Sequence, residues 1–182
     1  MMLMNLVLMC VMWSASTFNY YLLTFFLKYI PGNIFTNTAI SNASELSAYA
    51  ASGYLMNMMG VKISFFTGFL IASIGGTLLI FCFEIASAMP VFVLLAKFGV
   101  SFAFNVSYLG TPQLFPVVLT GTAFGICNIF SRFSTVLSAP VAEFTDPLPM
   151  IIFTSLTVIA GVLSLFLQVP KTEKKTEDKD LK

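Results

Sequence analysis

Six long apolar stretches make up most of the chain, and short polar or proline-containing breaks separate them. A helix needs about 20 apolar residues to cross the hydrocarbon core of a bilayer, and each stretch is about that long or longer. Breaks such as Pro31-Gly32-Asn33 and Asp146-Pro147 supply the turns between them. The pattern therefore predicts an all-α integral membrane protein, a bundle of six helices at residues 3–30, 34–58, 63–83, 90–110, 116–144 and 149–169.

The distribution of charge indicates a membrane body followed by a polar tail. Of the 182 residues, 58% are hydrophobic and 9% are charged, whereas soluble domains are about 25% charged. Five of the nine basic residues and four of the eight acidic residues fall in the last twelve positions. We therefore expect one membrane unit, residues 1–170, and a charged, disordered cytoplasmic tail, residues 171–182.

The number of helices predicts where the chain ends lie. An even number of crossings places both termini on the same side of the membrane. Lys62, in the second turn, falls on that side together with the lysine-rich tail. Cytoplasmic loops carry an excess of lysine and arginine. We therefore expect both termini to be cytoplasmic, in a multi-pass protein of the plasma membrane or an organelle membrane.

Several classes of function are disfavoured by residues that are scarce or missing. A net charge of +1 gives no basic patch to neutralise phosphates, so we expect no nucleic-acid partner. Histidine, the commonest general base and metal ligand, does not occur, and Cys10, Cys82 and Cys127 are widely spaced within apolar runs. The sequence has no phosphate-binding glycine loop and no nucleophile motif. We expect no enzyme activity, no metal and no cofactor.

Polar residues inside the predicted spans are the candidates for function. Ionisable groups are costly within a membrane and normally face the bundle interior or a water-filled cavity. The first, second, fourth and fifth spans each present a polar face, whereas the third (63–83) and the sixth (149–169) have no ionisable residue in their interiors. This order is expected if every third helix packs outside and the others line a cavity. The candidate substrate-binding residues are Arg132, Asn128, Tyr20, Tyr21, Lys97, Asn105 and Glu45.

The charged candidates also have a purely structural explanation. Glu45 and a cation on another span can pair to hold the bundle together. The sequence leaves both interpretations open for Glu45 and Lys97. Arg132 lies among small polar residues, which favours a role facing a ligand.

The fifth span and the segment before it carry a family resemblance. Residues 114–116 read Leu-Phe-Pro, residues 121–133 read Gly-Thr-Ala-Phe-Gly-Ile-Cys-Asn-Ile-Phe-Ser-Arg-Phe, and residues 138–140 read Ser-Ala-Pro. These stretches resemble the organic cation/anion transporters of the major facilitator superfamily. Shorter matches extend the resemblance over residues 1–170, at residues 18–21, 45–48, 97–105 and 148–170. The resemblance implies the C-terminal six-helix half of a twelve-helix transporter.

This resemblance implies transport of a small organic solute by alternating access. In organic anion transporters of the family, a basic residue on the matching span contacts the anionic substrate, and Arg132 stands at that position. Tyr20 and Tyr21 match an aromatic pair that lines the substrate cavity. An organic anion is therefore the more expected substrate. The implied partners are the lipid bilayer, the solute and a second six-helix half, from the same or a separate chain.

Some charged positions of the family are replaced in this sequence. Gln113 and Thr120 stand where the family has an acid and an arginine, and the turn at residues 59–62 keeps a single basic residue. In the family, these groups form cytoplasmic charge networks that help to hold the alternate conformations. The alternative expectation is therefore a transport-inactive accessory subunit of a larger membrane complex. A third expectation is a part of a longer transporter.

Overall fold

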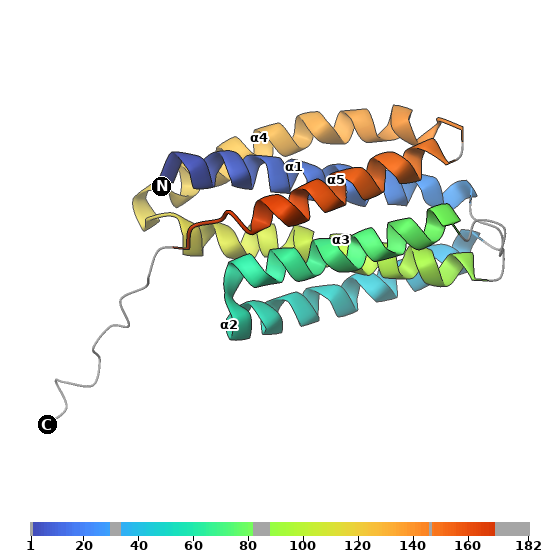
Figure 1. The fold of residues 1–182 in the computed structure, drawn as a ribbon, viewed down its shortest axis with the longest axis horizontal. Coiled ribbons are helices and arrows are strands. Elements are labelled where there is room, and N and C mark those ends of the chain that lie inside the picture. The colour runs from blue at the N-terminus through green and yellow to red at the C-terminus, as the bar shows by residue number, and fades with distance from the viewer. Residues whose placement is uncertain (1, 30–33, 82–87, 146, 170–182) are drawn as a thin grey trace, which may run out of the picture.

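The computed structural model describes residues 2–29, 34–81, 88–145 and 147–169. Figure 1 shows the helices lying side by side along one long axis. The expected tail at residues 171–182 lies outside the described residues. All regular structure in the described ranges is helical: α1 (Met2–Phe26), the short 3₁₀-helix η1 (Leu27–Tyr29), α2 (Ile34–Phe81), α3 (Met89–Leu114), α4 (Val117–Ala142) and α5 (Leu148–Ser164).

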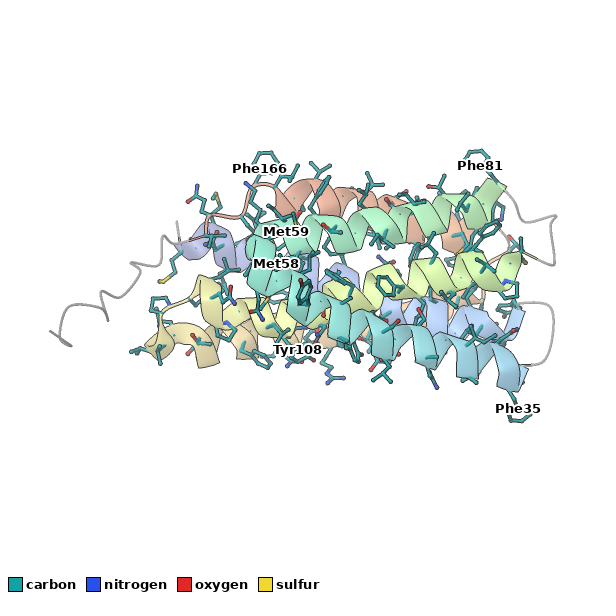
Figure 2. The ribbon with its side chains drawn as sticks, turned by 90° about the horizontal axis from the view of Figure 1, so that it is seen from below. Phe35, Met58, Met59, Phe81, Tyr108 and Phe166 are labelled. Atoms are coloured by element: carbon teal, nitrogen blue, oxygen red, sulfur yellow. The ribbon has the colours of Figure 1, made fainter. Side chains whose placement is uncertain are left out.

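Helix α2 consists of two helical arms that fold back on each other. Gly60 interrupts it with φ 80° and ψ 172°, a backbone conformation that is essentially restricted to glycine. Residues 34–59 and 61–81 therefore run antiparallel, as Figure 1 and Figure 2 show. With the two arms counted separately, the described residues form six helical rods. The predicted all-α membrane bundle is confirmed.

The lengths and surfaces of the helices suit a bilayer. Asn37–Phe81 has 45 residues, about twice what one crossing needs, in agreement with the two arms of α2. Helix α5 is apolar and shorter, with 17 residues. Large apolar side chains such as Phe81 and Phe166 point away from the bundle (Figure 2). Among the described residues, four helical segments are long and apolar enough to cross a membrane: Met2–Tyr29, Asn37–Phe81, Met89–Leu114 and Val117–Ala142.

Helices α3 and α5 end several residues away from the expected positions. Helix α3 continues through Pro112, beyond the expected end at residue 110. Pro116 explains the later end, because the residue before a proline is driven out of the helical region. Phe115 is accordingly extended, with φ −121° and ψ 145°. Helix α5 ends at Ser164, before the expected residue 169.

The second arm of α2 packs against α3 with almost no side chain between the two backbones. A Cβ atom on Gly99 would lie 2.3 Å from the backbone nitrogen of Ala72, and one on Gly75 would lie 2.5 Å from that of Ala96. Small residues allow this close approach, which favours helix association in membranes. Helix α5 also packs on α2. A Cβ atom on Gly76, in the second arm, would meet side chains of α5. The two rods without ionisable residues in their interiors are therefore in contact.

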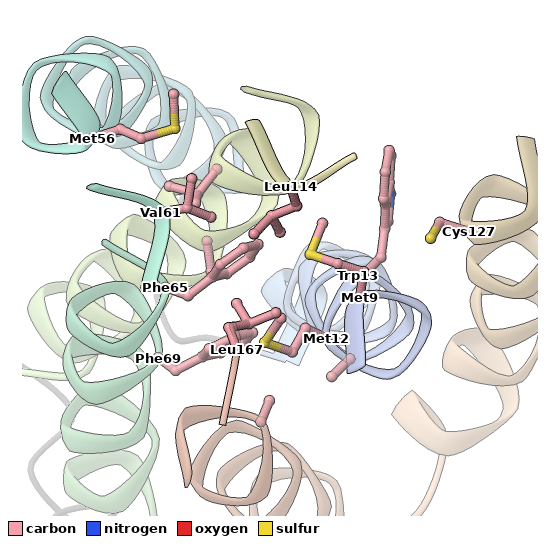
Figure 3. Close-up of a cluster of buried hydrophobic side chains, with 14 of the residues drawn as sticks. Met9, Met12, Trp13, Met56, Val61, Phe65, Phe69, Leu114, Cys127 and Leu167 are labelled. Carbon is pink, nitrogen blue, oxygen red and sulfur yellow. The ribbon is translucent and has the colours of Figure 1, made fainter. Parts of the chain in front are cut away.

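A buried apolar core joins α1 to the second arm of α2. Figure 3 shows Met9 and Met12 of α1 on the side that faces Phe65 and Phe69 of α2. All four side chains are fully buried. Lipid is as apolar as these side chains, so packing contacts, more than burial itself, hold such a core together.

Helix α4 is much less buried than the other three long helical segments. It packs mainly on α1 and only slightly on α3. Its buried side chains are small, which lets the two helices approach closely; they are Ala123, Cys127, Ser131, Ser138 and Ala142. Helix α4 therefore has a broad apolar face that the described residues leave uncovered.

The two ends of the described chain lie at the same end of the bundle. The Asn5 amide Nδ2 donates to the Gln168 carbonyl at 2.7 Å, and the Gln168 N–H donates to Asn5 Oδ1 at 3.1 Å. Figure 1 shows the start of α1 and the chain after α5 at that end. An even number of rods produces this arrangement. The side of the membrane that it faces stays a prediction.

Candidate functional site

A carboxylate on the first arm of α2 is the centre of a polar network. Glu45 accepts hydrogen bonds from the Tyr20 hydroxyl of α1, at 2.8 Å to Oε1 and 2.9 Å to Oε2. The Tyr49 hydroxyl, one helical turn after Glu45, donates to Oε1 at 2.5 Å. Residues four apart on a helix share a face, which is why Tyr49 reaches the carboxylate. Two phenolic donors thus hold Glu45, and one of them links α1 to α2.

Lys97 of α3 brings a positive charge to the same tyrosine. Its side chain is 2% exposed, and its Nζ donates to Thr24 Oγ1 at 2.7 Å. The Nζ atom also lies 3.4 Å from the centre of the Tyr20 ring. A cation over an aromatic face is attracted by the quadrupole of the ring. Tyr20 therefore contacts both charges, with its ring on Lys97 and its hydroxyl on Glu45.

The two charges are joined through the tyrosine without a direct ion pair. The salt bridge found among the described residues joins Lys28, just after α1, to Glu143, just after α4. Opposite charges near each other reduce the cost of placing either in a membrane. The contact through Tyr20 suits both a structural and a functional role for Glu45 and Lys97.

Asn105 connects α3 to the first arm of α2. Its Nδ2 donates to Ser52 Oγ at 2.7 Å and to the Tyr49 carbonyl at 3.3 Å. Asn105 lies two turns after Lys97 on the same face of α3, so one face of this helix contacts both α1 and α2. The network therefore ties three helices together within the membrane body.

A chain of aromatic rings extends the network towards α4. Tyr20 stacks on Phe104 with 5.4 Å between ring centres, and Phe104 meets the edge of Tyr108 at 5.1 Å. Tyr108 in turn contacts Phe124 of α4 at 5.4 Å. Tyr21 joins the same chain through Tyr20, at 5.3 Å. Aromatic side chains of α1, α3 and α4 are thus in contact with one another from Tyr20 to Phe124.

Arg132 lies apart from this network. Its side chain is exposed, and with Asn128 it lines an open recess of about 380 Å³ along α4. Arg132 forms no ion pair with any residue that the structure describes. It follows Phe124 by eight residues, about 12 Å along the helix axis. Arg132 and Asn128 therefore lie further along α4, outside the network around Glu45.

Five of the seven predicted site residues meet in one network, and two do not. Tyr20, Tyr21, Glu45, Lys97 and Asn105 are connected by the contacts above, whereas Arg132 and Asn128 lie along α4. The sequence prediction missed further members of the network. The four-residue spacing of Tyr49 from Glu45 and of Thr24 from Tyr20 was a usable signal. Phe104 and Tyr108 carried no signal, because aromatic residues in membrane helices usually serve packing.

The network and the α4 recess together offer phenol and amide groups, one carboxylate, one ammonium group, one guanidinium group and several aromatic faces. Groups of these kinds can orient an organic solute. In the described part of the chain, no three His, Cys, Asp or Glu side chains come together in a way that could hold a metal ion. Fold and site thus define a multi-pass membrane protein with a polar and aromatic network inside its bundle.

Known proteins similar to this chain are solute carriers. No family model matches the sequence. The chain is 33% identical over 167 residues to Solute carrier family 22 member 15 of Xenopus tropicalis, covering 85% of this chain and 31% of that protein. It is 31% identical over 170 residues to Solute carrier family 22 member 13 of Homo sapiens, covering 90% and 30%. It is 28% identical over 163 residues to the human Organic cation/carnitine transporter 2, covering 86% and 29%.

These matches identify the relatives of the chain. It is homologous to the solute carriers of family 22, and its resemblance to the organic cation/anion transporters is confirmed. The names of these relatives indicate membrane transport of small organic solutes rather than catalysis. The chain spans about a third of the length of the curated relatives that it matches.

Proposed function

We propose that the chain transports a small organic anion, as the C-terminal half of a transporter that works by alternating access. The inner wall comprises the network around Tyr20, Glu45 and Lys97 and the face of α4 that carries Arg132. The family 22 relatives support transport of an organic solute. One of them is named for organic cations and carnitine, so the charge of the substrate has to be argued from this chain's own residues.

The charge balance of the wall supports an anion. Glu45 and Lys97 contribute opposite charges to the same tyrosine and compensate each other. Arg132 is exposed and has no acidic partner within the described residues. The wall therefore keeps one uncompensated positive charge. Charges act strongly across a cleft with low-dielectric walls, so this wall attracts anions and repels cations. The exposed, unpaired state of Arg132 is the observation that carries the proposal.

A second six-helix half completes the cavity in this proposal. Helix α4 leaves an apolar face uncovered, with Val117 93% and Phe133 72% exposed. Rocking of two halves about a central site is the alternating-access scheme of this superfamily. The missing half is a second copy of this chain, a separate chain or another part of the same protein.

In this proposal, both ends of the chain lie in the cytoplasm. Lys62 follows the turn at Gly60, and Figure 1 shows that turn at the same end of the bundle as the start of α1. Lysine is enriched on the cytoplasmic side of membrane proteins. The Asn5–Gln168 contact joins the start of α1 to the segment after α5 at this end.

Charge variants of Arg132 test the proposal. The chain is expressed in cells with the N-terminal half of a family 22 relative, and uptake of a panel of labelled organic anions and cations is measured. Arg132→Ala should lower anion uptake about tenfold or more, since a hydrogen bond to a charged group contributes about 1.5–3 kcal/mol. Arg132→Lys should retain much of the uptake. Lys62→Ala, which removes a positive charge from a turn, should change uptake less than twofold (about 0.4 kcal/mol).

Two results would contradict this assignment. Unchanged anion uptake by Arg132→Ala would remove the arginine from the site. Uptake of cations alone, lost in Glu45→Gln, would assign the opposite substrate class. A third result, normal surface abundance with no uptake of any solute, would favour the accessory subunit. One observation favours that alternative: Thr120, where the family has an arginine, donates its hydroxyl to the Pro116 carbonyl at 3.0 Å and serves the helix start.

A further inference from the structure

Two cysteine thiols that are far apart in the sequence are in contact in the fold. The Sγ atoms of Cys10 on α1 and Cys127 on α4 lie 3.5 Å apart, although 117 positions separate them along the chain. Both thiols are free. Cys127 is completely buried, whereas Cys10 is partly exposed. The sequence indicated only isolated small residues in apolar runs, and the packing of α4 on α1 brings two of them together.

We infer that Cys10 and Cys127 are an oxidisable pair, which a hydroperoxide converts into a disulfide that fixes α4 to α1. One thiol attacks the peroxide oxygen, which gives a sulfenic acid and releases an alcohol. The second thiol then displaces water from the sulfenic acid and forms the S–S bond. Two thiols and one hydroperoxide thus give one disulfide, one alcohol and one water. The hydroperoxide is the two-electron oxidant.

Cys10 is the thiol that an oxidant reaches. It lines a recess of about 600 Å³ between α1, α4 and α5, a volume typical of small-molecule sites. The lining is apolar apart from Ser14 and Ser134. The Ser134 hydroxyl already donates to backbone carbonyls, including that of Ser131 at 2.8 Å. An apolar oxidant such as a lipid hydroperoxide therefore suits this entrance better than an ionic one.

The two sulfur atoms have to move only a short distance to form a disulfide. A disulfide bond is about 2.05 Å long, so the two Sγ atoms approach by about 1.5 Å. Small residues flank Cys127 on the face of α4 that packs on α1, such as Ala123 and Ser131. Helices that meet through small side chains already lie close together. A slight closure of this interface forms the bond.

The bond acts on the helix that carries Arg132. Helix α4 is held mainly by α1, and Cys127 directly precedes Asn128 in the sequence. A covalent link at Cys127 therefore restricts the position of the α4 wall relative to Tyr20 and the rest of α1. Formation of the disulfide does not depend on transport, so it is measured separately from the proposed function.

Mass spectrometry of oxidised membranes tests the inference. Vesicles that contain the whole chain are treated with cumene hydroperoxide, and the remaining thiols are blocked with a maleimide. The expected product is a linked Cys10–Cys127 peptide that is two hydrogen atoms lighter than the sum of the free peptides. On a non-reducing gel the chain should migrate faster, because the link closes a long loop, and dithiothreitol should reverse the shift. Cys82→Ser should keep the link, whereas Cys10→Ser should abolish it.

A second probe keeps the test independent of folding defects in the variants. Phenylarsine oxide bridges neighbouring thiols without oxidising them. In the unaltered chain it should protect both Cys10 and Cys127 from a maleimide that is added after unfolding in detergent, and the hydroperoxide should then form no link. Overoxidation of Cys10 to a sulfinic acid without any link would overturn the inference. A link between two chains, or one that uses Cys82, would do the same.

Discussion

The Tyr20 hydroxyl of α1 donates hydrogen bonds to both carboxylate oxygens of Glu45 on α2, at 2.8 and 2.9 Å. The ring of the same tyrosine lies 3.4 Å from the ammonium group of Lys97 on α3. One side chain thus contacts a carboxylate and an ammonium group that belong to two other helices. The packing of these helices and the chemistry of the inner wall therefore depend on the same contact.

Tyr20→Phe should destabilise the bundle and reduce uptake. The substitution keeps the ring under Lys97 and removes one of the two phenolic donors to Glu45. Because Glu45 is half-buried and keeps the Tyr49 donor, the loss should be that of one hydrogen bond, about 0.5–1.5 kcal/mol. Unfolding by denaturant in detergent measures the change. Tyr54→Phe is the matched control, because Tyr54 lies on the same arm as Glu45 and is 68% exposed. Equal stability of the two variants would show that the Tyr20 hydroxyl contributes nothing to the fold.

Gly60→Ala should destabilise the turn between the arms of α2. A side chain at φ 80° and ψ 172° is strained, at a cost of about 1–3 kcal/mol. Gly53→Ala, on the first arm, is the control, because nothing lies within 4 Å of its added Cβ atom and its φ is not positive. Alanine favours the helix over glycine there by up to about 1 kcal/mol. The temperature of thermal unfolding should therefore fall in Gly60→Ala and rise in Gly53→Ala. A shift of both variants in the same direction would contradict the assigned turn.

Gly99→Ala should separate α3 from the second arm of α2. The added Cβ atom would lie 2.3 Å from the backbone nitrogen of Ala72, so the backbones must move apart. Overpacking of this kind costs about 1–3 kcal/mol or more. Gly125→Ala on α4 adds the same atom with nothing within 4 Å. Size-exclusion chromatography and unfolding in detergent compare the two variants. A well-folded Gly99→Ala variant of unchanged stability would rule out the close contact.

Glu143 should give the stability of the bundle an acid-side pH dependence. Hydrogen bonds from Lys28 and Tyr29 to its carboxylate hold the pKa of Glu143 below its ordinary value. A carboxyl group with a lowered pKa in the folded state stabilises the fold above its ordinary pKa. The contribution disappears as the pH falls through the lowered pKa. Glu143→Gln should flatten this part of the stability curve slightly, because the pair is exposed to solvent. If the stability of Glu143→Gln falls with acid pH as steeply as that of the unaltered chain, the ion pair contributes nothing to stability.

The sequence predicted features that depend on local properties of the chain. The breaks between helices followed from proline and glycine, and the polar faces followed from four-residue spacings such as that of Asn128 and Arg132. The cost of an ionisable group in a membrane then marked Glu45 and Lys97 as inward-facing, and both take part in the network.

The contacts between helices could not be predicted in the same way. Tyr20 stands between Glu45 and Lys97, and Cys10 meets Cys127, because of how each helix is rotated about its own axis. That rotation is set by tertiary packing, such as the small-residue stripe of α4. No spacing in a single sequence reports it. The separation of Arg132 from the Tyr20 network has the same origin.

We predict that the polar faces of α1 and α4 border water, whereas α5 borders lipid. Single-cysteine variants measure this directly, in a chain whose Cys10, Cys82 and Cys127 are serine and which is expressed with its partner half. The positions are Tyr21→Cys, Asn128→Cys and Val158→Cys, and the reagent is a charged, membrane-impermeant maleimide. We predict labelling of the first two, slowed by an organic anion. Val158→Cys should stay unlabelled, although Val158 is 49% exposed in the bundle. Labelling of Val158→Cys as fast as Asn128→Cys, or none at either polar position, would contradict the account.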